Sequence, residues 1–127
     1  MNAWRTNIRC YVSPAGNNKI ADWYNDLSAQ EQSDADEFLK NMRLTPDWEM
    51  PNYRPRLRDA KGLGELRWQS EKKQHRILGF FMSGNWYALV GCVHKQQVYH
   101  PAGSLETAKR YKGQIERREV YTVDYDL

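Results

Sequence analysis

Residues 61–95 restrict the possible folds of this chain more than any other stretch. Three segments, 64–69, 75–82 and 86–94, are rich in β-branched and aromatic residues, and short polar segments typical of turns separate them. Connections this short join antiparallel strands, because a parallel connection needs a crossover of a dozen or more residues. The stretch therefore predicts an antiparallel three-strand meander.

Side chains alternate between the two faces of a strand, which assigns the charged residues of the meander to faces. Glu65, Arg67 and Gln69 alternate with apolar residues and therefore share one face, so Arg67 is predicted to point away from the apolar core. In the next segment Arg76 alternates with Ile77 and lies on a face of mixed polarity. The exposure of Arg76 is therefore less sharply defined than that of Arg67.

The sequence before the meander predicts one strand and two helices. Residues 4–12 alternate in polarity as a half-buried strand does, and residues 18–25 have apolar side chains at helical spacing. Ser28 followed by Glu31 is a capping box, in which each side chain accepts from a backbone amide at the start of a helix. We expect this second helix to run to about residue 44.

The remaining segments are predicted from prolines, a cap and a weak alternation. Residues 45–55 contain three prolines and are expected to form an irregular connection. Ser104 is predicted to cap a third helix that extends to about residue 119. Residues 120–127 alternate like a short strand that either pairs with a sheet edge or stays loose.

These elements predict an α+β fold. Its small antiparallel or mixed sheet would consist of the N-terminal strand and the three-strand meander, with two N-terminal helices and a C-terminal helix. The 127 residues suffice for one core, so we expect a single domain over residues 1–127 with a short C-terminal extension from about residue 116. The cysteines, Cys10 and Cys92, are expected to be reduced and packed.

Charge is unevenly distributed, although the formal net charge is only +3. Residues 18–43 hold three basic and six acidic side chains, whereas residues 53–73 hold seven basic and three acidic ones. We therefore expect a basic strand surface and an acidic helical one.

No apolar run approaches the roughly 18 residues of a membrane helix, and no signal-peptide core is present, so a cytoplasmic protein without a membrane partner is expected.

Two short motifs stand within the meander, Gly-Leu-x-Glu-Leu-Arg at residues 62–67 and Arg-Ile-Leu at residues 76–78. With the order of the elements, they resemble the RelE/ParE superfamily of bacterial and phage toxins, and within it the phage-derived HigB-type toxins. The likeness extends from about residue 10 to residue 115. Other matching residues are Cys10, Tyr11, Ser13 to Gly16, Trp23, Leu27, Arg56, Leu57, His75, Lys95, Pro101 and Glu106 to Lys109.

The resemblance implies a toxin of a type II toxin–antitoxin system that binds the ribosome and cleaves messenger RNA in the decoding site. It also implies a cognate antitoxin, often a helix-turn-helix protein, as partner. The implied endoribonuclease uses no metal or other cofactor and acts through the RNA 2′-hydroxyl. Such cleavage needs a base, an acid and cations for the charge on phosphorus.

Residues 95–101 depart from the pattern of that family. The family often has Lys-Lys-x-x-Lys-Thr-Pro, whereas this chain has Lys-Gln-Gln-Val-Tyr-His-Pro. Gln96 and Tyr99 thus replace two lysines, and His100 replaces a threonine. Fewer cations are therefore available at the end of the last strand for binding phosphate.

Arg67 and Arg76 are the principal catalytic candidates. A guanidinium group stays charged and meets two phosphate oxygens at once, and strands hold such groups in place better than loops do. We expect both arginines to project from adjacent strands into one shared, water-facing cleft. The alternative is that they are surface arginines that pair with Glu65 or Glu71.

The acid and base candidates follow the last strand of the meander. His94 and His100 titrate near neutral pH, and Lys95 would share the role if neighbouring cations lowered its pKa. Tyr99 would stack on a base or donate its hydroxyl to the phosphate. The alternative for each is an ordinary surface role. Candidates for docking the RNA backbone are Arg54, Arg56, Arg58, Lys61, Lys72 and Lys73.

The sequence leaves a rival function open. A protein of this superfamily without nuclease activity would act by binding, as a gyrase inhibitor does, or would be a phage-encoded protein that has lost cleavage. A third possibility is a protein with the fold and no toxicity.

Overall fold

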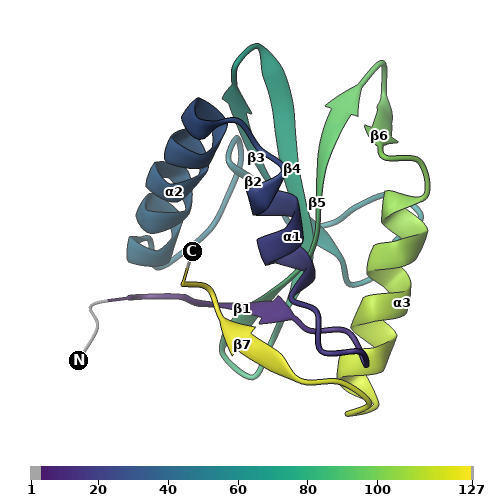
Figure 1. Ribbon diagram of the computed structural model, residues 1–127. Helices are drawn as coiled ribbons and strands as arrows, with labels where there is room; N and C mark the ends of the chain where they lie inside the picture. The colour runs from purple at the N-terminus through teal and green to yellow at the C-terminus, as the bar shows by residue number, and fades with distance from the viewer. Residues whose placement is uncertain (1–3, 127) are drawn as a thin grey trace.

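The predicted meander forms the centre of a mixed sheet in the computed structural model of the protein, which describes residues 4–126 (Figure 1). Strands β3, β4 and β5 pair in sequence as antiparallel neighbours. Within the described residues the chain forms three helices and a seven-stranded sheet. The elements are β1 (Asn7–Tyr11), α1 (Lys19–Asn25), α2 (Ala29–Leu44), β2 (Tyr53–Arg54), β3 (Gly64–Ser70), β4 (Lys73–Met82), β5 (Asn85–Lys95), β6 (Val98–His100), α3 (Ser104–Glu116) and β7 (Thr122–Asp124).

The sheet has the strand order β2-β3-β4-β5-β1-β7, and β6 forms a hairpin with the far end of β5. Strand β1 lies parallel to β5, which is possible because the two strands are far apart in sequence. Every other pairing is antiparallel among residues 4–126. The predicted α+β fold with a mixed sheet and three helices is confirmed.

The helices cover the two faces of the sheet separately. Helices α1 and α2 bury Ile20 and Leu39 against one face, where Trp86 is fully buried. Helix α3 buries Ala108 and Ile115 against the other face. Figure 1 shows α3 apart from the α1–α2 pair, with the strands between them.

The first two helices begin as their sequences predict. The side chain of Asn18 accepts hydrogen bonds from the backbone amides of Ile20 and Ala21 at the start of α1. The capping box of α2 is complete, because Ser28 and Glu31 each accept from the other's backbone amide. The cap predicted for α3 is wrong. Its N-cap is Gly103, at a φ of 82°, and the Ser104 hydroxyl donates instead to the carbonyl of Pro101 at 2.6 Å.

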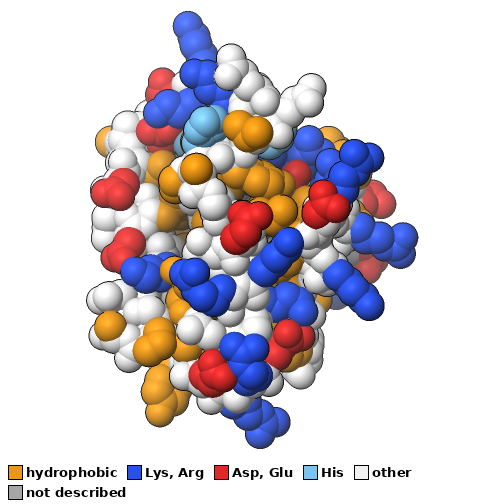
Figure 2. Space-filling view, turned by 90° about the vertical axis from the view of Figure 1, so that its right-hand side faces the viewer, with side chains coloured by type: hydrophobic (Ala, Val, Ile, Leu, Met, Phe, Trp, Pro, Cys, Tyr) orange, Lys and Arg blue, Asp and Glu red, His pale blue; other side chains and the backbone are white. Residues whose placement is uncertain are grey.

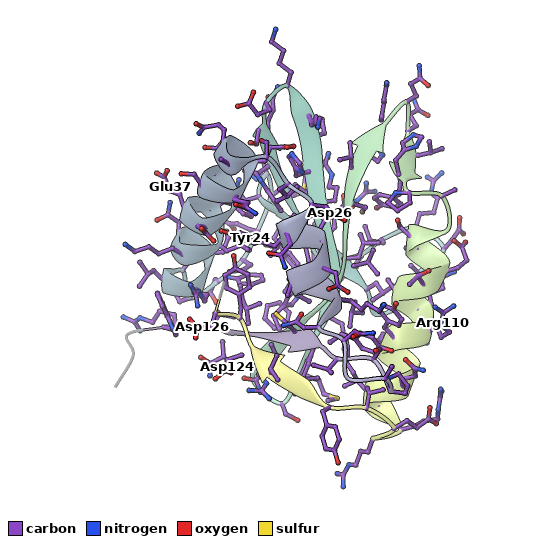
Figure 3. The ribbon with its side chains drawn as sticks, viewed as in Figure 1. Tyr24, Asp26, Glu37, Arg110, Asp124 and Asp126 are labelled. Atoms are coloured by element: carbon purple, nitrogen blue, oxygen red, sulfur yellow. The ribbon has the colours of Figure 1, made fainter. Side chains whose placement is uncertain are left out.

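Two short strands form the edges of the sheet: β2 was not predicted, whereas β7 lies in the C-terminal segment that was predicted to alternate like a strand. The proline-rich connection contains β2, which pairs with β3. The C-terminal residues form β7, which pairs with β1 at the opposite edge and is fixed there by Arg9, whose guanidinium lies 2.6 Å from the Asp124 carboxylate. Figure 3 shows Asp124 and Asp126 on this C-terminal segment and Arg110 on α3. Of the two outcomes left open for these residues, pairing with an edge is the one observed.

The two cysteines are free and buried, as predicted. Burial raises the pKa of each thiol to about 12, so both are neutral packing groups at pH 7.

In the part of the chain from residue 4 to residue 126, no helix combines the length and the apolar character that a membrane crossing requires.

Candidate functional site

The two predicted arginines lie side by side on the face of the sheet that also carries α3. Arg67 of β3 and Arg76 of β4 are direct partners in the antiparallel register. Directly opposed residues project to the same face, so the two guanidinium groups are neighbours. They also line a common hollow of about 270 Å³. Their predicted adjacency on one face is confirmed.

Glu65 is the counterion of both arginines. Its carboxylate lies 3.4 Å from Nε of Arg67 and 3.7 Å from Nε of Arg76. The other carboxylate oxygen accepts a hydrogen bond of 2.5 Å from the hydroxyl of Tyr99. Glu65 is only 3% exposed, so a buried negative charge holds three side chains of the site together.

The two arginines differ in accessibility, and here the prediction of a water-facing pair is wrong for Arg76. The side chain of Arg67 is 27% exposed, whereas that of Arg76 is 6% exposed. Arg76 donates to the backbone carbonyl of His75 at 2.9 Å, and its Nε has no hydrogen-bond partner among the described residues. Arg67 is therefore the arginine that a ligand reaches first.

His94 and Tyr99 belong to the same face. They are partners in the β5–β6 hairpin, their rings are in edge contact with centroids 5.5 Å apart, and His94 is also opposite Gln74 in β4. Burial, followed by the charges of Arg76 and Arg67, lowers the pKa of His94. Burial and the Glu65 carboxylate raise the pKa of Tyr99. At pH 7 the site therefore contains a neutral imidazole and a neutral phenol.

Lys95 and His100 lie on the opposite face, so their predicted place beside the arginines is wrong. In the β5–β6 hairpin Lys95 pairs with Val98 and His100 pairs with Val93, and these four residues alternate with His94 and Tyr99. His100 lines a second hollow, of about 340 Å³, on the side of α1. The alternation separates the four acid–base candidates into two pairs, one on each face.

Most of the predicted backbone-docking residues flank the arginine face. Arg54 lies opposite Glu65 in the register of β2 and β3. Arg56, Arg58 and Lys61 are exposed on the loop that follows β2. Apolar residues of this loop, Leu57 among them, pack into the core beneath α3, which places the loop on the α3 side.

Lys72 in the β3–β4 turn and Lys73 at the start of β4 have different environments. Lys72 is exposed at the turn, whereas Nζ of Lys73 lies 3.4 Å from the Glu31 carboxylate on the α2 side. Figure 2, which views the molecule from the α3 side, shows Lys and Arg side chains across the surface with acidic ones among them. The predicted basic surface is therefore interrupted by acidic groups.

Three amide side chains complete the hollow beside the arginines, and the sequence analysis missed them. Gln69 and Gln74 are exposed register partners two residues along their strands from Arg67 and Arg76, and the exposed Asn52 lines the same hollow. The alternation that placed Gln69 on the face of Arg67 was the available signal. The sequence indicated Glu65 only as an alternative ion-pair partner of the arginines. Its hydrogen bond from Tyr99 could not be predicted, because that contact depends on the position of β6.

A second ionisable cluster lies under α2, on the far face of the sheet. Nε2 of His75 is 3.0 Å from the Glu31 carboxylate, and the His75 ring is stacked on Trp68 at 5.6 Å between centroids. His75 is only 1% exposed. These contacts and this burial make His75 a packed residue of β4. Among residues 4–126 no three His, Cys, Asp or Glu side chains are arranged to hold a metal ion.

Fold and site define a class: a small α+β protein of RelE-like architecture with paired arginines on the sheet face beside its C-terminal helix. Residues 22–112 match the family described as Phage derived protein Gp49-like (DUF891), and the chain belongs to this phage-derived family. The family is associated with RelE/ParE-like toxins. No curated protein and no solved structure gives a significant match to the chain.

Proposed function

We propose that this protein is the toxin of a type II toxin–antitoxin system, similar to HigB-type toxins, and that it cleaves messenger RNA on the ribosome in the cytoplasm. The observation that carries the proposal is the register pairing of Arg67 with Arg76 beside His94 and Tyr99. Family membership supports the toxin part of the proposal. The nuclease part is supported by the chemistry of the four side chains.

In the proposed reaction Arg67 holds the scissile phosphate, because it is charged and partly exposed. His94 takes the proton of the 2′-hydroxyl, and the 2′-oxygen attacks phosphorus as the bond to the 5′-oxygen breaks. A neutral imidazole suits this step, and the lowered pKa of His94 keeps it neutral at pH 7. The departing 5′-oxygen takes its proton from Tyr99, whose raised pKa keeps it protonated until a strongly basic alkoxide forms. The products are a 2′,3′-cyclic phosphate and a 5′-hydroxyl.

The burial of Arg76 supports a second candidate function. Its guanidinium faces Glu65, and Lys95 and His100 are on the other face, so fewer cations reach a phosphate here than the sequence implied. The alternative is a non-catalytic toxin of the same fold that acts by binding a protein such as DNA gyrase. In that function Arg67 and the exposed loop arginines would bind acidic side chains of the target.

Induction of the full chain without its antitoxin separates the two functions. Mapping transcript ends would show codon-positioned breaks for the nuclease, lost on Arg67→Ala and on His94→Ala and retained on Lys95→Ala. Arrested replication with intact transcripts would indicate the binding toxin. If neither transcripts nor replication change, both proposals are wrong.

We also propose a cognate antitoxin as the partner, often a helix-turn-helix protein in such systems. An acidic segment laid over the arginine face would neutralise Arg67 and the loop arginines and block the site. Co-expression with the neighbouring reading frame, followed by purification through one partner, tests this. Recovery of the toxin alone at high yield and without harm to the cell would contradict it.

A further inference from the structure

A hollow of about 340 Å³ lies between α1 and the face of the sheet that is turned away from Arg67 and Arg76. Its floor is a row of register partners on adjacent strands, His75 of β4, Val93 of β5 and His100 of β6. Alternation turns the next residue along each strand toward the arginine face. The sheet itself therefore separates this hollow from the proposed active site.

The sides of the hollow are mostly apolar. Trp23 and Leu27 of α1 line it together with Val93, and all three are only partly buried, so apolar surface remains for a ligand to cover. The Trp23 indole lies directly on β5, where a Cβ atom at Gly91 would be 2.4 Å from the ring. Ligand sites are typically apolar cavities of about 300 to 1,000 Å³ with a few placed polar groups. The hollow has the size and the apolar walls of such a site.

The buried end of the hollow is polar. His75 is 1% exposed, and its Nε2 lies 3.0 Å from the Glu31 carboxylate. Because a carboxylate only accepts, the ring proton belongs on Nε2, and Nδ1 is left as the acceptor. Burial lowers the pKa of His75, which keeps the ring neutral at pH 7. Nδ1 makes no hydrogen bond within residues 4–126, so this end offers an acceptor that lacks a donor.

The open end of the hollow carries a negative charge. Asp26, at the C-terminal end of α1, is exposed, and its side chain has no hydrogen-bond or ion-pair partner among the described residues (Figure 3). The other two charged groups of the hollow compensate each other, because Nζ of Lys73 lies 3.4 Å from the Glu31 carboxylate. A cation is therefore the ligand charge that complements this end.

We propose that the hollow binds a small aromatic amine that carries a hydroxyl group at its far end. The ammonium group would pair with Asp26, and the hydroxyl would donate to Nδ1 of His75, which lacks a donor. The ring would cover Trp23 and Val93 between these two ends. The inference goes beyond the proposed nuclease function and does not depend on it, because the hollow lies on the other face of the sheet.

Isothermal titration calorimetry of the purified full chain with three probes tests the chemistry of the ligand. Tyramine has the ammonium group, the ring and the hydroxyl. Phenethylamine lacks the hydroxyl, and 3-(4-hydroxyphenyl)propionate has a carboxylate in place of the ammonium group. Tyramine is expected to bind with a Kd of about 1 mM or tighter at neutral pH and low salt. Phenethylamine should bind about five-fold more weakly, the effect of one hydrogen bond, and the propionate more weakly still.

Variants test where the amine binds. Asp26→Asn keeps the shape and removes the charge, and it should weaken tyramine binding about two- to five-fold, as expected for an exposed ion pair. Val93→Phe fills the floor of the hollow and should abolish binding. The control is Asp22→Asn, which changes an exposed aspartate of α1 outside the hollow and should leave the affinity unchanged.

Three results would overturn the inference. The first is the absence of saturable tyramine binding at about ten times the expected Kd. The second is an affinity for tyramine that neither Asp26→Asn nor Val93→Phe changes, which would place the amine elsewhere on the chain. The third is equal affinity for tyramine and either of the other probes, which would mean that the two polar ends do not select the ligand. A urea unfolding midpoint equal to that of the unchanged protein shows that a variant is folded, and if Val93→Phe is not, the surface change Asp26→Asn decides the second result.

Discussion

At the scale of single residues, Glu65 holds the arginine face in its geometry. Its carboxylate is almost inaccessible and contacts Arg67, Arg76 and Tyr99 together. A buried arginine without a counterion is costly, because removing one partner of a buried ion pair leaves the other charge uncompensated. Glu65 thus maintains the site even though its charge competes with a phosphate for Arg67.

The first prediction concerns the charge of Glu65. Glu65→Gln keeps the shape and removes the charge, and it is expected to lower the free energy of unfolding by about 3 kcal/mol. Tyr99→Phe removes only one hydrogen bond to the same carboxylate and should cost about 1 to 2 kcal/mol. Urea unfolding at pH 7 measures both. Glu119→Gln, which changes an exposed ion pair with Arg117, is the control and should leave the midpoint unchanged. Equal stability of Glu65→Gln and the unchanged protein would mean that the arginines need no counterion.

The second prediction concerns the ionisable cluster under α2 and its dependence on pH. Burial lowers the pKa of His75, against the opposing effect of Glu31. Burial alone would raise the pKa of Glu31, but the hydrogen bonds with Ser28 and the charge of Lys73 lower it overall. Both groups therefore bind protons more weakly in the folded protein than in the unfolded chain. The contribution of this cluster to stability should be complete above about pH 6.5 and fall below it, first through His75 and then, below about pH 4.5, through Glu31.

The contribution of His75 is separable by a variant that does not titrate. In His75→Gln the decline of the unfolding free energy just below pH 6.5 should be smaller than in the unchanged protein, whatever the stability at pH 7.5. Urea unfolding at half-unit steps from pH 7.5 to pH 5 provides the slopes. An identical slope in the two proteins would show that His75 does not couple folding to pH.

At the scale of elements, the position of α1 depends on a glycine in β5. A Cβ atom at Gly91 would lie 2.4 Å from the indole of Trp23, so the ring packs directly on the strand backbone. This contact brings α1 against β5 and closes one wall of the hollow that His100 lines. No short-range signal in the sequence predicts it, because Trp23 and Gly91 are far apart along the chain.

The third prediction tests this contact. Gly91→Ala should lower the free energy of unfolding by about 1 to 3 kcal/mol through overpacking against the indole. In the background of Trp23→Ala the same change should cost much less, because the clash is gone. The urea midpoints of the two single variants and the double variant form a double-mutant cycle. Additive losses would indicate that the ring moves aside freely.

Elements with local signals are the ones that the sequence predicts well. The capping box at Ser28 and Glu31 fixes the start of α2, and the turn residues Ser83 and Gly84 separate β4 from β5 as expected. Strands β2 and β6 were not predicted, because two or three residues become a strand only through pairing with a long neighbour. The cap of α3 was wrongly assigned to Ser104. The true cap could not be predicted, because the conformation of Gly103 and the hydrogen bond from Ser104 to Pro101 depend on how the chain leaves β6.

At the scale of the whole molecule, the candidate site combines what alternation predicts with what only the packing decides. Alternation placed Arg67 and Gln69 on one face, and the antiparallel meander brought Arg76 beside them. The placement of His94 and His100 on opposite faces of the sheet follows from the register of β6, and no sequence motif indicates that register. The burial of Arg76 results from the surrounding core and from Glu65, so sequence alone left its exposure open.

Electrostatics on this scale yields the fourth prediction, which concerns binding of single-stranded RNA. The exposed loop cations Arg56, Arg58 and Lys61 lie on the α3 side with Arg67, and each phosphate contact releases counterions. The logarithm of the binding constant should therefore fall linearly with the logarithm of salt concentration, by about 0.7 for each phosphate neutralised. The double variant Arg56→Ala/Arg58→Ala should bind more weakly at low salt and show a slope smaller by about 1.4.

The control for this prediction is Lys40→Ala on α2, an exposed cation on the other side of the sheet, which should change neither the affinity nor the slope. Fluorescence anisotropy with a labelled single-stranded RNA between about 50 and 200 mM salt measures both quantities, a range over which phosphate-driven binding weakens strongly. A slope that responds equally to the loop and to the α2 variants would mean that net charge attracts the RNA. A slope that responds to the loop variant alone would locate the RNA backbone on the arginine face, because the loop cations and Lys40 lie on opposite sides of the sheet.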